Sequence, residues 1–128
     1  MLNSKGLFIG PYGENREEFV RLFELLFNDV VQWRRNFHPE DDRLVTREGQ
    51  RELSFLQSQD KLHDALDQLL GEMKQSVPFH SHRFLGHMHS DLLIPALLGY
   101  FTGMLFNQNN VVGESSPITT RKEIEFCT

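Results

Sequence analysis

Residues 91–106 read DLLIPALLGYFTGMLF, and this stretch decides which fold the chain can adopt. It is apolar nearly all round, so it predicts a buried helix that needs cover on several sides. Pro95 stands early in the stretch, where it either occupies the first helical turn or kinks the helix. Two amphipathic helices cannot cover such a segment alone.

Upstream, two amphipathic helices are expected. In the first, over about 14–37, apolar residues recur at spacings of three and four: Phe19, Leu22, Phe23, Leu26, Val30, Trp33 and Phe37. His38-Pro39 ends it, because the residue before a proline is pushed out of the helical region, and a turn follows near Asp41. The second pattern is Leu62, Ala65, Leu66, Leu69 and Met73, with Asp60 as its N-cap and an end before Val77.

The remaining segments connect these helices. Residues 7–13 end in FIGPYG and predict an extended arm with a turn, and residues 78–90 predict a loop. A polar connector at 107–115 leads to Ser116-Pro117, an N-cap and N1 pair that opens a last helix. Strands alternating with helices are absent, so the fold class is mainly α.

Bulk composition excludes several classes of protein. The chain has 128 residues, 13 basic against 18 acidic, and no basic block is longer than the Arg34-Arg35 pair, which argues against nucleic acid as a partner. The single cysteine, Cys127, indicates a reducing, cytoplasmic location. No leader pattern and no stretch of about 20 apolar residues is visible, so neither export nor a membrane is expected.

Few patterns carry chemistry by themselves. The GxSxG, HExxH, GxGxxG and P-loop motifs are absent, so self-contained catalysis is not expected. Trp33 and the Arg34-Arg35 pair could form a binding patch, but a core tryptophan and two solvent-facing arginines are the more ordinary interpretation. His80, His82, His87 and His89 form HxHxxxxHxH, a spacing that can ligate zinc or copper. A mixture of surface and packed histidines is favoured, and no metal ligand is assigned.

Residues 80–105, HSHRFLGHMHSDLLIPALLGYFTGML, and 107–120, NQNNVVGESSPITT, resemble the group II pyridoxal-phosphate-dependent amino-acid decarboxylases. Bacterial tyrosine decarboxylases are the most similar branch, with glutamate and aromatic amino-acid decarboxylases further away. FIGPYGENREEF at 8–19 and WRRNFHPEDD at 33–42 extend the resemblance over most of the chain.

The resemblance implies a cytoplasmic homodimer with an α/β fold of the aspartate-aminotransferase type (fold type I), truncated here before the cofactor-binding sheet. Residues 1–77 would then be a helical arm and dimerisation segment. Residues 78–128 would hold a pocket-lining loop, the buried helix and the start of the large domain. The family's Schiff-base lysine follows a histidine, which is true of none of Lys5, Lys61, Lys74 and Lys122. We therefore expect an inactive piece of a longer enzyme, with pyridoxal 5'-phosphate held only by the full-length protein.

The resemblance also implies the substrate-binding residues. The position of His87 contacts the substrate, and that of Ser90 lies near the substrate carboxylate and the cofactor. Asn109 and Val111 lie on the connector that reaches into the partner's site. His89 replaces an asparagine expected in tyrosine decarboxylases, and Val111 replaces an aromatic residue of some relatives. An acidic substrate, as in glutamate decarboxylases, and a non-catalytic helical module with a metal-binding histidine loop are the alternatives.

The apolar segment 91–106 generates a first prediction. The 128-residue chain should self-associate, because an uncovered apolar helix leaves an exposed patch that a second copy can bury. Sedimentation velocity over a concentration series measures this. A single monomeric species at high concentration would contradict it.

Overall fold

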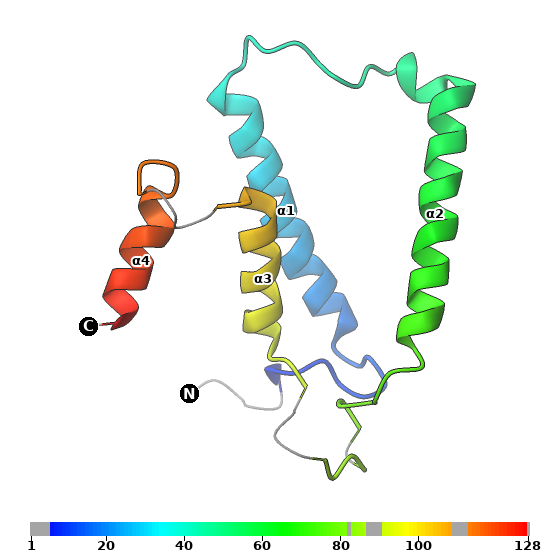
Figure 1. Cartoon of the computed structure of the whole chain (residues 1–128), viewed down its shortest axis with the longest axis vertical. Coiled ribbons are helices and arrows are strands. Elements are labelled where there is room, and N and C mark those ends of the chain that lie inside the picture. The colour runs from blue at the N-terminus through cyan, green and yellow to red at the C-terminus, as the bar shows by residue number, and fades with distance from the viewer. Residues whose placement is uncertain (1–5, 82, 87–90, 109–112, 128) are drawn as a thin grey trace. The chain divides into compact units, whose positions relative to one another are not determined.

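The computed structural model describes residues 6–81, 83–86, 91–108 and 113–127, and over these residues the chain is helical (Figure 1). Its α-helices are α1 (Arg16–Phe37), α2 (Leu53–Met73), α3 (Ile94–Phe106) and α4 (Pro117–Cys127), and a short 3-10 helix, η2 (Gly49–Arg51), precedes α2. Extended pairing within the described ranges is limited to one antiparallel bridge, between Phe8 and Leu93. The prediction of a mainly α chain is confirmed for this part of the molecule.

The chain divides into two compact units. One unit comprises Met1–Arg35 with Ser90–Thr128, and so contains most of α1 together with α3 and α4. The other comprises Asn36–His89 and contains η2 and α2.

Helix α1 forms where the apolar periodicity predicts it. Glu17 and Glu18 lie in its first turn and Arg34 and Arg35 in its last, so charges of the favourable sign lie at both ends of the helix dipole. The helix ends at Phe37, directly before His38-Pro39. The His38 carbonyl then accepts a hydrogen bond from the Asp41 amide at 3.2 Å, which confirms the predicted turn.

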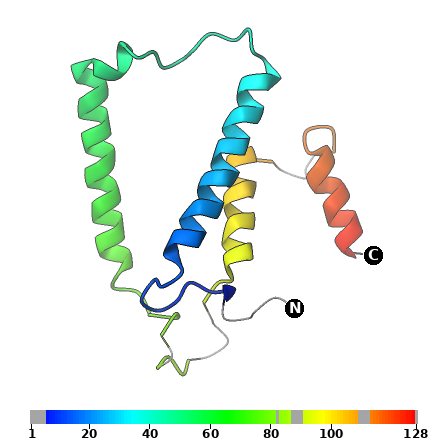
Figure 2. The ribbon, with the colours of Figure 1, turned by 180° about the vertical axis from the view of Figure 1, so that it is seen from behind.

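Helices α1 and α3 lie side by side in both views of the chain (Figures 1 and 2). The rings of Phe23 and Phe101 meet edge to face with centroids 4.8 Å apart, and those of Trp33 and Phe106 lie 5.1 Å apart. Val30, between these two aromatic pairs along α1, is buried. These aromatic contacts, at two separate points along α1, fix the pairing of the two helices.

The N-terminal arm ties the start of α3 to the start of α1. The Leu7 carbonyl accepts a hydrogen bond from the Ile94 amide at 2.7 Å. Asn15, just before α1, holds the arm with both ends of its amide: Nδ2 donates to the Phe8 carbonyl at 2.6 Å, and Oδ1 accepts from the Gly10 amide at 2.9 Å. The predicted arm and turn are confirmed, because the Gly13 amide closes the turn on the Gly10 carbonyl at 2.7 Å.

Helix α3 begins at Ile94 with Pro95 in its first turn, which resolves the choice between a first-turn proline and a kink. The predicted helix is present, but the 128-residue chain does not bury it, which agrees with the expectation that it needs further cover. Ile94 is its one buried residue among those described, while Tyr100 is 66% and Met104 69% exposed. The described part of the chain packs on the α1 side of the helix and leaves this apolar surface uncovered.

Helix α2 begins at Leu53, well before Asp60, so the prediction that Asp60 is the N-cap is wrong. Glu52 occupies that position with an extended backbone and no side-chain cap. The short helix η2 directly precedes α2, and its Gly49 amide donates a hydrogen bond to Thr46 Oγ1 at 3.0 Å. Helical structure therefore begins earlier in the chain than the apolar pattern predicts. The helix ends at Met73, before Val77 as predicted, and buries none of its described residues.

Helix α4 begins at Pro117 as predicted, with Ser116 fully buried beside it. The Ser116 carbonyl accepts a hydrogen bond from the Thr120 amide at 3.0 Å, which starts the helix. Among the described residues, none of the helices combines the length and apolar character that crossing a bilayer requires.

The arm generates a stability prediction. Asn15→Ala removes two hydrogen bonds between the arm and α1, and should lower the free energy of unfolding by about 1–2 kcal/mol. Chemical denaturation, with hydrogen exchange at the Ile94 amide, measures the loss. Asn28→Ala, at an exposed position of α1, is the control and should cost less than about 0.5 kcal/mol. Equal effects of the two substitutions would show that Asn15 does not hold the arm.

Candidate functional site at the two ends of α3

All four sequence-predicted substrate contacts, His87, Ser90, Asn109 and Val111, lie outside the described residues, as do His82 and His89. Their assignment therefore stays a prediction. In the sequence they fall into two groups on either side of α3: the loop residues precede Asp91, and the connector residues follow Gln108. The described residues next to these predicted contacts in the sequence are the two ends of α3.

The predicted loop is a series of turns where the structure describes it. The Ser81 amide donates to the Pro78 carbonyl and the Phe84 amide to the Ser81 carbonyl, both at 2.9 Å. The rings of Phe79 and Phe84 meet edge to face, 5.0 Å apart. A Cβ atom added to Gly86 would overlap the Phe84 ring, so a larger residue at this position would displace that ring.

The N-terminal end of α3 is fixed by backbone contacts. The Ile94 amide bonds to the arm, and Leu93 forms the bridge with Phe8. Just before α3, the Asp91 Oδ1 accepts a hydrogen bond from the Leu92 amide at 2.9 Å. The start of α3 is thus attached to the arm at two adjacent residues, Leu93 and Ile94.

The C-terminal end of α3 is held by a side chain of α1. Arg34 Nη2 donates to the Leu105 carbonyl at 3.1 Å, satisfying a carbonyl of the last turn. Asn107 follows in the left-handed conformation, with φ 46° and ψ 40°, and its amide bonds to the Gly103 carbonyl at 2.9 Å. The interpretation of Arg34 as a purely solvent-facing arginine is corrected here. A contact across 71 positions of sequence leaves no local signal that could have predicted it.

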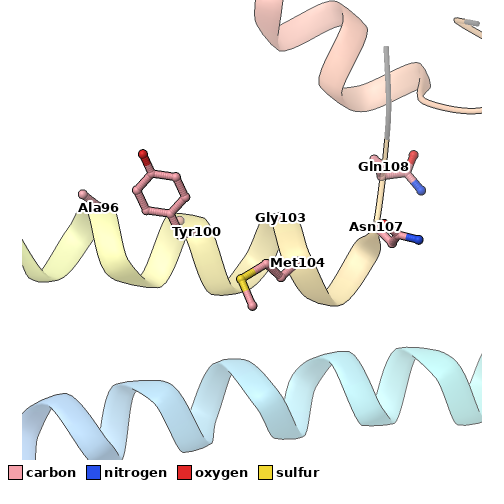
Figure 3. A pocket seen from close by; sticks show the side chains of 7 residues that line it. Ala96, Tyr100, Gly103, Met104, Asn107 and Gln108 are labelled. Carbon is pink, nitrogen blue, oxygen red and sulfur yellow. The ribbon is translucent and has the colours of Figure 1, made fainter. Parts of the chain in front are cut away.

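A groove of about 690 Å³ runs along the exposed surface of α3 (Figure 3). Its lining residues recur at helical spacing and end on the two amides after the helix: Ala96, Gly99, Tyr100, Gly103, Met104, Asn107 and Gln108. The Tyr100 hydroxyl points away from α1 (Figure 3). The groove is therefore mainly apolar along the helix and polar where the chain leaves it.

Charged groups gather elsewhere in the described chain. Arg21 donates hydrogen bonds to the Glu18 carboxylate at 2.9 and 2.7 Å on the surface of α1, and this lowers the pKa of Glu18 and raises that of Arg21. No group of three histidine, cysteine, aspartate or glutamate side chains within the described ranges is arranged to hold a metal ion. Metal binding by the histidine loop stays untested, because three of its four histidines lie outside those ranges.

Comparison with known proteins points to one class of enzyme. Over 126 residues, 97% of this chain, the sequence is 40% identical to the L-tyrosine decarboxylase of Levilactobacillus brevis. It is 36% identical to the L-tyrosine decarboxylase of Enterococcus faecalis and 32% identical to that of Enterococcus faecium over the same length. No protein-family model matches the chain. These tyrosine decarboxylases are homologues of the chain along nearly its whole length.

The chain spans about a fifth of the length of these curated relatives, 20% of the first two and 21% of the third. The similarity thus includes α1 to α4 and the two segments that flank α3. It leaves four fifths of each relative without a counterpart in these 128 residues.

The groove generates a prediction about its glycines. A Cβ atom added at Gly99 or Gly103 meets no other atom within 4 Å, so alanine at either position should stabilise α3 by about 0.5–1 kcal/mol. Gly71→Ala in α2, where the space is equally open, is the control and should show the same gain. Thermal unfolding of the 128-residue chain, at a concentration low enough to keep it monomeric, measures all three. A loss at Gly99 and Gly103 with a gain at Gly71 would contradict an open groove in the monomer.

Proposed function

We propose that this chain is the N-terminal part of a pyridoxal-phosphate-dependent amino-acid decarboxylase, with tyrosine as the favoured substrate. The observation that carries the proposal is the 32–40% identity to three L-tyrosine decarboxylases over 97% of the chain. The relatives' names favour tyrosine over the glutamate-type alternative. In this proposal the segment contributes subunit contacts and a wall of the substrate pocket, and is inactive alone.

The uncovered apolar surface of the chain supports its place in a larger assembly. Tyr100 and Met104 on α3 are more than 60% exposed, and Leu62 and Leu69 on α2 are more than 50% exposed. Monomeric proteins rarely leave so much apolar surface in contact with water. Burial of these surfaces against the rest of a fold type I subunit and against a second subunit of a homodimer is the arrangement we propose.

The described lysines do not fit the role of the cofactor-binding residue. Lys61 and Lys74 are exposed on and after α2, and Lys122 pairs with Glu125 at 2.6 Å on α4. A lysine that binds pyridoxal phosphate needs an enclosed site that lowers its pKa and excludes water. When bound, the cofactor supplies the electron sink for decarboxylation. We therefore propose that residues of the longer protein hold it.

The part that this segment plays is to orient the substrate. Imidazole at His87 can donate a hydrogen bond to a carboxylate or a phenol, and the Ser90 hydroxyl can both donate and accept. Asn109 adds an amide from the connector, and Val111 an apolar surface. Ser90 is also the one residue of the chain proposed to lie near the cofactor.

Assay of the full-length protein tests the proposed function. Supplied with pyridoxal phosphate, it should release carbon dioxide from L-tyrosine in preference to L-glutamate, with tyramine as the second product. Preference for glutamate would replace the substrate but keep the class of enzyme. Release from neither amino acid, in a preparation that contains the cofactor, would overturn the proposal.

His87 generates a prediction for the full-length enzyme. His87→Ala should lower kcat and kcat/KM together by roughly one to two powers of ten, because a lost charge-assisted hydrogen bond of about 1.5–3 kcal/mol matters most in the transition state. Cofactor content, measured by absorbance, should not change. His82→Ala is the control and should stay near the wild-type rate. Full turnover in His87→Ala, or damage by His82→Ala instead, would show that the loop is wrongly assigned.

A further inference from the structure

The last turn of α3 is held from α1 by two adjacent residues. Arg34 donates from Nη2 to the Leu105 carbonyl at 3.1 Å, and the ring of Trp33 lies 5.1 Å from that of Phe106. Trp33 and Arg34, which we call the α1 clamp, thus contact consecutive residues of α3. The clamp joins parts of the chain that are about 70 positions apart in sequence.

The chemistry of the clamp suits the end of a helix. The final carbonyls of a helix have no partner within it and carry the negative end of its dipole. A guanidinium satisfies such a carbonyl with a planar, permanently charged donor. The contact between the rings of Trp33 and Phe106 attaches the same turn at a second, adjacent residue.

The clamp acts where the chain leaves α3. Directly after Phe106, Asn107 turns the backbone into the left-handed region, and its amide bonds back to the Gly103 carbonyl at 2.9 Å. The position and direction of the departing chain depend on the last helical turn. That turn is the part of α3 that Trp33 and Arg34 contact.

We propose that Arg34 is a positioning residue for the substrate pocket, acting with Trp33 through the last turn of α3 on the connector that follows it. The inference rests on the proposed function, in which Asn109 and Val111 of that connector contact the substrate. Arg34 itself touches neither substrate nor cofactor. Its role is to fix the point from which the connector starts.

The test replaces Arg34 in the full-length protein with methionine, which keeps the aliphatic stem, and with lysine, which keeps the charge. In Arg34→Met the amides of residues 104–107 should exchange faster, because the last turn is no longer capped. For tyrosine, kcat/KM should fall by about threefold to tenfold, mainly through KM, as expected for a lost hydrogen bond at an exposed position. Cofactor content should be unchanged, and Arg34→Lys should recover most of the loss.

Arg35→Met is the matched control, because Arg35 neighbours Arg34 and its side chain makes no hydrogen bond or ion pair within the described ranges. It should leave both exchange and kinetics at wild-type values. Faster exchange with unchanged KM would show a purely structural cap and overturn the positioning role. Unchanged exchange would overturn the cap itself. A wild-type protein without decarboxylase activity would remove the proposed function, and the pocket role with it, while the exchange result would still judge the cap.

Discussion

The packing of α3 against α1 is the interaction on which the described part of the larger unit depends. Phe23 with Phe101, and Trp33 with Phe106, join the two helices at separate points along their length. Each pair buries ring surface that would otherwise contact water, and each has an edge or tilted geometry that favours one alignment. Val30 and Ile94 are the buried apolar residues of the described chain. Because so few residues are buried, the two aromatic pairs determine much of how α1 and α3 align.

Hydrogen bonds at the two ends of α3 add to this packing. At the start of α3, the Ile94 amide is bound by the arm, and the arm is in turn held by Asn15. At its end, the Leu105 carbonyl is bound by Arg34. Both ends of α3 are thus held by hydrogen bonds from other parts of the unit. In the proposed enzyme, the segments that flank α3 in the sequence carry the substrate contacts.

The uncovered surface is the second constraint. The groove along Gly99, Tyr100 and Gly103 is apolar and open, and α2 buries none of its residues within the described ranges. Glycine at two positions one helical turn apart allows another element to approach the α3 backbone closely. Exposed apolar surface of this size is unfavourable in water, and in the proposed enzyme the rest of the longer protein would cover it.

The amino-acid sequence by itself determined the local structure. The three- and four-residue spacing of Phe19, Leu22 and Phe23 predicted α1, His38-Pro39 its end, and Pro117 the start of α4, because these signals act over a few residues. The resemblance to tyrosine decarboxylases was also readable from the residues, and the comparisons support it. Asp60 was wrongly predicted as a cap, since the turn at Gly49–Arg51 starts α2 earlier without an apolar pattern.

Only the tertiary structure decided which surfaces are covered and which distant residues meet. The apolar character of α3 predicted burial, but burial depends on what packs against each side, and the described chain covers only the α1 side. The sequence contains no sign of the contact that Arg34 makes, because one of two adjacent arginines on a helix can equally well point into solvent. Its hydrogen bond to Leu105 exists only because the aromatic pairs bring the two helices together in this alignment.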